Sequence, residues 1–147
     1  MVREAEIKVL SVMDNLGDSG LPEGESERVE SVYSGFFHKT SDGVLLTYTE
    51  GEGEGACMSE IKYSGGTVSV KRNGAIESEL VFEEGKTHTS LYRVPPYTFD
   101  AEVVTRRIRA SVTDEGGLIE LFYNMKIGGA EKTARMKIWI STNSSRG

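Results

Sequence analysis

The fold of this chain is decided by the stretch GGLIELFYNMKIGGAEKTARMKIWI, residues 116–140. Apolar side chains stand at every second position from Ile119 to Ile127, and again from Ala134 to Ile140. Because successive side chains of a β-strand point to opposite faces, each half of the stretch has one apolar face. Gly128-Gly129 between the halves is a hairpin signal. The stretch therefore predicts two antiparallel strands that cover one side of a core.

The same alternation continues outward through the chain, from Ala5 to Ile140, in segments separated by glycine turns. No segment keeps a helical period long enough to compete, so about ten strands are expected. Gly65-Gly66 and Asn73-Gly74 predict two-residue hairpin turns, which need positive φ at both central positions. Gly35 inside the second strand predicts a bulge or bend, and a change of parity near Thr105 predicts a β-bulge.

The short connections make sequential strands antiparallel neighbours, which gives a meander. A flat sheet of ten strands would be near the usual limit and would expose two edges, whereas closure removes both. We therefore predict an all-β fold, an antiparallel up-and-down (meander) β-barrel of about 8–10 strands, with a two-sheet sandwich as the alternative. Residues 1–141 would form this single domain, and residues 142–147 a flexible C-terminal tail. An acidic loop, Asp14 to Glu27, interrupts the strands near the start.

The composition restricts the classes of partner. A formal net charge of −6 repels phosphate backbones, so we expect no nucleic-acid partner. One local basic cluster, Arg106, Arg107 and Arg109, is interpreted as a solvated strand end rather than as an anion site. The single Cys57, the absence of a signal-like start and the lack of a long apolar run predict a soluble cytoplasmic protein without a membrane partner. Homodimerisation is compatible with both hypotheses of function given below.

An ordered set of residues gives the chain a resemblance to a known family. The set consists of Gly35-Phe36-Phe37, LLTYTE (residues 45–50), VSVKRNG (residues 68–74), Phe82, Gly85, Tyr92, Thr105, Gly117 and FYNM (residues 122–125). In order and spacing it resembles the YwiB-like proteins over most of the chain, and only the ordered set is specific. The resemblance implies a small cytoplasmic bacterial protein with a lipocalin-like (calycin-type) barrel, and it implies no activity. The chain departs from the pattern at Tyr97, where a glycine is expected.

The side chains used in common catalytic and metal sites are scarce. Two histidines, His38 and His88, and one cysteine cannot supply the paired ligand spacing of a zinc site. There is no G-x-S-x-G nucleophile elbow. Glu50, Glu52 and Glu54 of the GEGEG turn could offer carboxylates to calcium, but a solvated turn is the favoured interpretation. We therefore expect no catalytic residues, no metal and no cofactor, and a protein that is not an enzyme.

Two charged residues stand on apolar strand faces. Arg72 follows two valines at a period of two, and Glu50 follows a leucine and a tyrosine in the same way. A charge inside a barrel needs a partner or water, so the two are predicted to pair, with Tyr48, Tyr92 and Thr105 supplying hydroxyl groups nearby. The alternative is that each long side chain reaches the solvent from its strand end. An arginine beside tyrosines also suits a carboxylate or phosphate ligand.

The sequence thus supports two hypotheses of function. In the first, Tyr48, Glu50, Arg72, Tyr92 and Thr105 are candidate ligand-binding residues for a small anionic molecule inside the barrel, and the acidic loop acts as a lid. In the second, the barrel is fully packed and serves as a structural or protein-interaction module. A ligand pocket of about 300–1,000 Å³ would distinguish the first from the second.

Overall fold

The computed structural model describes residues 2–15 and 27–142. Within these residues ten antiparallel strands close into one barrel in sequence order, because β1 pairs with both β2 and β10. The strands are β1 (Val2–Asn15), β2 (Glu27–Lys39), β3 (Gly43–Glu50), β4 (Cys57–Ser64), β5 (Thr67–Gly74), β6 (Glu77–Glu83), β7 (Thr87–Val94), β8 (Tyr97–Thr113), β9 (Gly116–Ile127) and β10 (Ala130–Thr142). The predicted meander barrel is confirmed.

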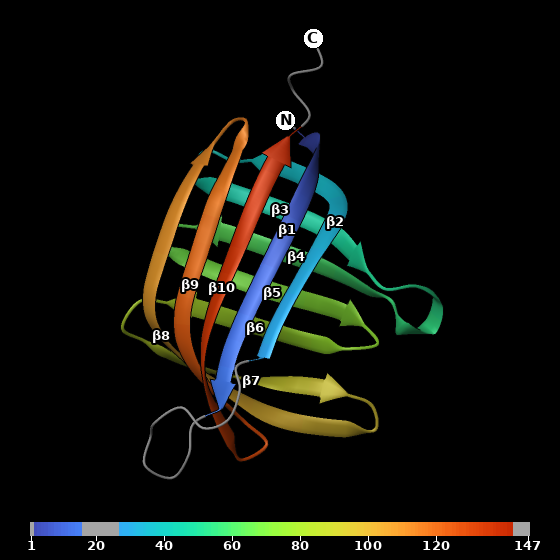
Figure 1. Cartoon of the computed structure of the whole chain (residues 1–147), viewed down its shortest axis with the longest axis vertical. Coiled ribbons are helices and arrows are strands. Elements are labelled where there is room, and N and C mark those ends of the chain that lie inside the picture. The colour runs from blue at the N-terminus through green and yellow to red at the C-terminus, as the bar shows by residue number, and fades with distance from the viewer. Residues whose placement is uncertain (1, 16–26, 143–147) are drawn as a thin grey trace.

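The barrel is flattened into two crossing layers. In Figure 1 the strands β8, β9, β10, β1 and β2 form one curved layer, and β3 to β7 cross behind it. The apolar faces of both layers meet in a continuous core. Its fully buried members include Ile7, Leu46, Val68, Phe82, Ile119, Leu121 and Ile138, each 0% exposed. A side chain that bordered a void large enough for water would have exposed surface, so the middle of the barrel is packed solid.

Residues 116–140 form β9 and most of β10. The turn between these two strands is Gly128-Gly129, with φ of 56° and 82°. The turn between β4 and β5 is Gly65-Gly66, with φ of 58° and 83°. Positive φ at both positions is what a tight hairpin needs and what glycine supplies at least cost. Both turns are as predicted.

The prediction for Asn73-Gly74 is wrong. Both residues remain in the β4–β5 ladder, where Asn73 pairs with Met58 and Gly74 pairs with Cys57. The chain turns only afterwards, before β6 begins at Glu77. Glycine is required at position 74 for a different reason, since a Cβ there would lie 2.2 Å from the carbonyl oxygen of Ala56.

The two predicted irregularities have different outcomes. The β8–β9 register shifts between Thr105 and Arg107, which confirms the bulge and leaves Arg106 and Arg107 both exposed. Of the two alternatives predicted at Gly35, the bulge is wrong, because β2 keeps a regular register on both sides, but the ribbon of β2 does bend as it passes from β1 toward β3 (Figure 1). A Cβ on Gly35 would lie 2.3 Å from the carbonyl oxygen of Thr47, so this glycine allows β3 to approach β2 closely.

The wall of the barrel is incompletely paired at one end. The described β2 residues begin at Glu27, but the β2–β3 ladder begins only at Gly35. The β6–β7 ladder is also short and joins only Glu77 to Arg93 and Ser78 to Tyr92, but its unpaired residues lie toward the opposite end, at the β6–β7 turn. At the end where β2 lacks a partner in β3, the inward-facing Tyr33 and Arg72 are half-buried, whereas Tyr48 and Ser59 are buried.

Two sequence predictions fall partly outside the described residues. β10 reaches Thr142, one residue beyond the predicted end of the domain, and the rest of the predicted tail lies outside the described part of the chain. The predicted lid, Asp14 to Glu27, is described only at its two ends. No helix within residues 2–15 and 27–142 is long and apolar enough to cross a membrane.

Candidate functional site

A row of polar side chains crosses five neighbouring strands at the incompletely paired end. It runs Tyr48, Ser59, Arg72, Ser78, Tyr92, from β3 to β7, and each residue is directly opposite the next. Residues directly opposite in antiparallel strands share a face, so all five belong to the inner face of the barrel. We call these five residues the polar row. The next inward row is apolar and consists of Leu46, Ile61, Val70 and Leu80.

Arg72 at the centre of the polar row is paired with Glu50. The guanidinium Nε lies 3.1 Å from Oε2 of Glu50, and the two side chains are 32% and 20% exposed. The N–H is not aligned well enough with that oxygen to form a hydrogen bond, so the contact is an ion pair. The structure thus joins the two charges that the sequence placed on apolar faces, in a position between full burial and free solvent.

Two hydroxyl groups hold the carboxylate of Glu50. Tyr33 donates to Oε1 at 3.1 Å, and Ser59 donates a short hydrogen bond to Oε2. The ring of Tyr33 stacks on that of Tyr48, with 4.5 Å between the ring centroids. Both carboxylate oxygens are therefore occupied, which leaves Glu50 little capacity to reorient.

The other end of the guanidinium is less constrained. Arg72 Nη1 donates to the hydroxyl of Tyr92 across 3.5 Å, the outer limit of a hydrogen bond. Among the described residues, no hydrogen-bond partner is recorded for Nη2. Since an arginine has five N–H donors, Arg72 keeps donors for a further partner.

The electrostatics of the cluster favour the charged arginine. Burial is the largest single influence on the pKa of Arg72, and it lowers that pKa. Glu50 and the nearby tyrosines together raise the pKa by more, so its net shift is upward. Burial also raises the pKa of Tyr48 and of Tyr33 above the ordinary value for a phenol. Both tyrosines therefore remain neutral hydrogen-bonding groups near pH 7.

The structure separates Thr105 from this cluster. Thr105 is buried, and its hydroxyl accepts a hydrogen bond from the backbone N–H of Glu83. Its neighbour Val104 pairs with Thr87 at the start of β7, whereas Tyr92 stands near the end of that strand. Thr105 thus holds the β6–β7 turn against β8, and its predicted place beside the ion pair is wrong.

Tyr33 and Ser59 join the site although they were not among the predicted residues. The alternating pattern places Ser59 on the same face as Cys57 and Ile61, and it gives Tyr33 the same parity as Phe37. These patterns were the only signal in the sequence. The alternating pattern does not give the register between β3, β4 and β5, and it is this register that sets Ser59 opposite both Tyr48 and Arg72.

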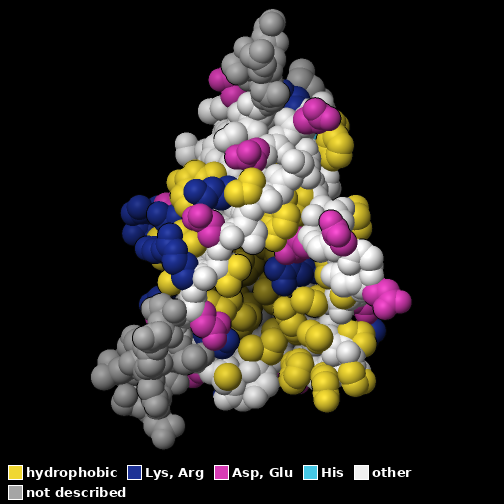
Figure 2. Space-filling model, turned by 45° about the vertical axis from the view of Figure 1, so that its right-hand side comes forward, with side chains coloured by type: hydrophobic (Ala, Val, Ile, Leu, Met, Phe, Trp, Pro, Cys, Tyr) yellow, Lys and Arg dark blue, Asp and Glu magenta, His cyan; other side chains and the backbone are white. Residues whose placement is uncertain are grey.

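Three surface pockets adjoin the described strands. One of about 260 Å³ is lined by Arg72 and Ser78 and, for the rest, by outward-facing residues of β5, β6 and β7 such as Lys71, Glu79 and Arg93. Tyr48, Glu50, Tyr92 and Thr105 line none of the three. Figure 2, which brings forward the side where β3, β5 and β7 end, shows a hollow lined mainly by hydrophobic side chains, with basic and acidic side chains inside it.

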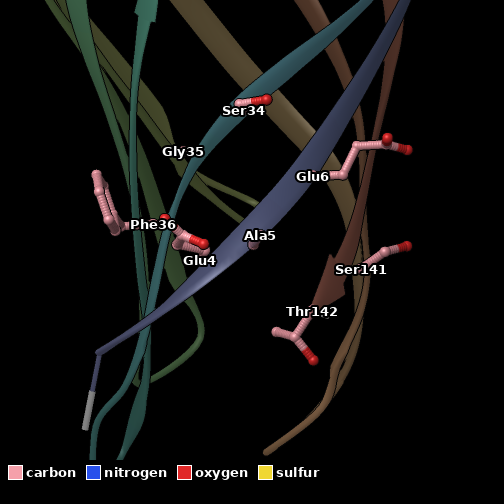
Figure 3. A pocket seen from close by; sticks show the side chains of 8 residues that line it. All are labelled: Glu4, Ala5, Glu6, Ser34, Gly35, Phe36, Ser141 and Thr142. Atoms are coloured by element: carbon pink, nitrogen blue, oxygen red, sulfur yellow. The ribbon is translucent and has the colours of Figure 1, made fainter. Parts of the chain in front are cut away.

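The largest of these pockets, of about 590 Å³, is a poor site for an anion. It lies over β1, β2 and β10, and its charged lining residues are Glu4 and Glu6. Figure 3 shows its lining side chains spread over an open surface, without convergence on one point. The third pocket, of about 410 Å³, includes Arg3 and Lys39, but Arg3 already donates to the carbonyl oxygen of Asp114.

The GEGEG turn does not gather its carboxylates. Glu50 faces Arg72, while Glu52 and Glu54 are exposed around the short 3₁₀ helix η1 (Gly53–Gly55). Within the described residues, no group of three or more His, Cys, Asp or Glu side chains is arranged to hold a metal ion. Glu50 therefore serves the ion pair, and the turn offers no described cation site.

Comparisons with known proteins agree with this architecture. The chain is 26% identical over 110 residues to the uncharacterized β-barrel protein YwiB of Bacillus subtilis (strain 168). The aligned residues make up 75% of this chain and 78% of that protein. The crystal structure of the B. subtilis protein matches with a TM-score of 0.83 at 24% identity, covering 97% of this chain and 93% of the other. A family model described as "Domain of unknown function (DUF1934)" matches residues 19–140. The chain therefore belongs to the DUF1934 family of YwiB-like β-barrel proteins.

Proposed function

We propose that this chain is a binding protein for a small anion, a carboxylate or a phosphate, which docks against Arg72 at the incompletely paired end of the barrel. One observation carries the proposal. Arg72 is fixed by Glu50 on one side, yet its side chain is 32% exposed and its Nη2 lacks a recorded partner among the described residues. A guanidinium with two or more available donors suits the planar, bidentate geometry of carboxylate and phosphate oxygens.

Glu50 positions the guanidinium without blocking it. The ion pair occupies Nε, and the two hydroxyl groups from Tyr33 and Ser59 stabilise the carboxylate in that position. An arriving anion would meet the opposite edge of the guanidinium beside Tyr92, whose hydroxyl is a further donor. Holding an arginine in one orientation before binding reduces the entropy that the ligand must overcome.

The packed core limits where a ligand fits. The middle of the barrel has no space for water, so a ligand threaded along the axis is disfavoured. The pocket of about 260 Å³ that Arg72 lines opens mainly on the outer face of β5, β6 and β7, so it does not define this site. A small anion, such as a short-chain carboxylate or a simple phosphate ester, is therefore favoured at the end of the barrel.

The proposal is tested by thermal-shift titrations of inorganic phosphate, citrate and short monocarboxylates. The natural protein, Arg72→Met and Lys62→Met would be compared, because Lys62 is an exposed basic residue on the outer face of β4. A ligand at about 100 times its Kd stabilises the folded state by about 2.7 kcal/mol, which raises the Tm of a domain of this size by several degrees. We expect at least one anion to shift the natural protein and Lys62→Met, and to leave Arg72→Met unmoved.

Two outcomes would contradict the proposal. A ligand shift that persists in Arg72→Met places the anion elsewhere. No shift by any anion, together with a clear loss of Tm in Arg72→Met alone, assigns Arg72 to the architecture of the barrel. The second result would favour the structural or protein-interaction module, which the solid core already suits.

A further inference from the structure

The outer face of the front layer carries a second ordered row of side chains. It runs Arg28, Val12, Arg135, Phe122, Arg107 across β2, β1, β10, β9 and β8, and each residue is directly opposite the next. The three arginines are exposed, while the valine and the phenylalanine between them are half-buried. We call these five residues the arginine row.

Two further arginines flank the arginine row on β8. Arg109 is exposed two residues beyond Arg107 and is directly opposite Glu120. Arg106 is exposed next to Arg107 because the bulge turns both residues outward, and its Nη2 donates to Thr133 Oγ1 at 3.0 Å. The bulge therefore adds a positive charge to the outer face, because in a regular strand one of these two adjacent arginines would point inward.

Two of the carboxylates nearby are paired with lysines, and a third, Glu84, accepts a hydrogen bond at 2.7 Å from the backbone N–H of Ile108, between Arg107 and Arg109. Glu30 lies 3.6 Å from Nζ of Lys8, and Glu120 lies 3.6 Å from Nζ of Lys137. Within residues 2–15 and 27–142, no ion pair is recorded for the arginines of the row or for the two that flank it. Figure 2 shows basic side chains gathered on the side to which the front layer turns in that view.

The spacing suits a linear polyanion. Neighbouring strands lie about 4.8 Å apart, so arginines on alternate strands are about 10 Å apart and the row extends over about 20 Å. A five-stranded face of that width is too wide to enter the major groove of duplex DNA, which is about 12 Å wide. A single-stranded nucleic acid, in contrast, can lie across the face. Phe122 stands between Arg135 and Arg107, where a ring beside two guanidinium groups can stack on a base.

We propose that the arginine row and its two flanking arginines bind the backbone of a single-stranded nucleic acid. The overall charge of −6 predicts the opposite, but it is an average over the chain, and the arginine row with its two flanking arginines is a local concentration of positive charge. Guanidinium groups bind phosphate oxygens bidentately, and the local cluster attracts them within a Debye length of about 8 Å in physiological salt. An anionic bilayer suits the row less well, because its apolar members are two, Val12 and Phe122, and insertion needs a wider apolar face.

The test is fluorescence anisotropy of a labelled 20-nucleotide single-stranded oligouridine, titrated with the full chain at several salt concentrations. Three to five phosphate contacts predict that log K falls with log salt concentration with a slope of about −2 to −3.5. In Arg107→Gln/Arg135→Gln we expect affinity at 50 mM salt to fall by about tenfold or more, and the slope to become shallower by about 1.4. Phe122→Leu should weaken binding about fivefold and leave the slope unchanged.

The matched control is Lys62→Gln/Lys71→Gln, which removes the same charge from exposed positions on β4 and β5. It should retain nearly the full affinity. The proposal is overturned if the natural protein does not bind the oligonucleotide at 50 mM salt, or if the control loses as much affinity as the arginine variant. It is also overturned if phosphatidylserine vesicles bind the arginine row while the oligonucleotide does not. Circular dichroism would verify that each variant is folded.

Discussion

Arg72 and Glu50 come from strands that are not neighbours, yet Nε of the arginine lies 3.1 Å from Oε2 of the glutamate. Ser59, on the strand between them, is directly opposite Arg72 and donates to the same carboxylate oxygen. The three side chains bind β3, β4 and β5 together at the end of the barrel where pairing is incomplete. The polar row therefore has a structural role beside the proposed binding role, and the predictions below separate the two.

Loss of Arg72 should destabilise the fold by an intermediate amount. A fully buried pair would cost about 3–5 kcal/mol to break and an exposed pair less than about 1, and this pair lies between those limits. We expect Arg72→Met to lower the free energy of unfolding by about 2 kcal/mol in urea denaturation. A double-mutant cycle with Glu50→Gln should give a coupling of about 1 kcal/mol. Strictly additive effects of the two substitutions would show that the contact contributes nothing to stability.

Ser59→Ala should cost about 1 kcal/mol. Ser59 is 2% exposed and its hydroxyl donates to Glu50, so removal of the hydroxyl leaves a partly buried carboxylate with one donor fewer. The control is Ser69→Ala on β5, which is half-buried and for which no side-chain hydrogen bond is recorded. If both variants unfold at the same urea concentration, Ser59 does not stabilise the carboxylate.

Gly35→Ala should be among the most destabilising single substitutions in the chain. Its Cβ would lie 2.3 Å from the carbonyl oxygen of Thr47 and 2.9 Å from Cβ of Tyr48, and a paired backbone cannot easily move away. We expect a loss of about 2–3 kcal/mol, measured by chemical denaturation. Gly55→Ala is the control, because a Cβ there meets nothing within 4 Å and φ is not positive. Equal stability of the two variants would contradict the close approach of β3 to β2.

The turn before β3 should make stability depend on pH in the acid range. Ser64 donates to Oδ2 of Asp42 at 2.6 Å and Thr40 donates to Oδ1 at 3.3 Å, and these bonds lower the pKa of Asp42 below its ordinary value of 3.8. A carboxylate with a lowered folded pKa stabilises the fold above its unfolded pKa, and that contribution disappears as the pH falls through the folded value. The difference in Tm between the natural protein and Asp42→Ala should therefore be present at pH 6 and decrease below pH of about 4. A difference that is constant from pH 6 to pH 2.5 would rule out this role for the carboxylate.

The sequence was sufficient for the architecture because the information is local. Strict alternation and paired glycines, as at Gly65-Gly66 and Gly128-Gly129, specify strands, turns and faces without reference to distant residues. Asn73-Gly74 failed because local turn preference was overridden by the ladder, in which Gly74 is crowded by the backbone of Ala56.

The site needed information that alternation does not contain. Parity placed Arg72 and Glu50 on the inner face, and the requirement for a partner predicted their pairing. The register that brings Ser59 between them depends on the lengths of two turns, so Ser59 was missed. Thr105 was placed correctly on the inner face but at the wrong height, since parity gives a face and not a position along the barrel.

The measurement that tests the central claim most directly is a phosphate titration followed by NMR of arginine side chains, with ¹⁵N in the arginines alone. The Nε–H signal of Arg72 is identified as the one missing from the spectrum of Arg72→Met. We predict that this signal moves as phosphate is added until the site is saturated, while the signal of Arg3, which already donates to the carbonyl oxygen of Asp114, moves little. If the Arg72 signal stays in place, or moves only linearly with ionic strength, then Arg72 does not bind phosphate and the polar row serves only to hold the barrel together.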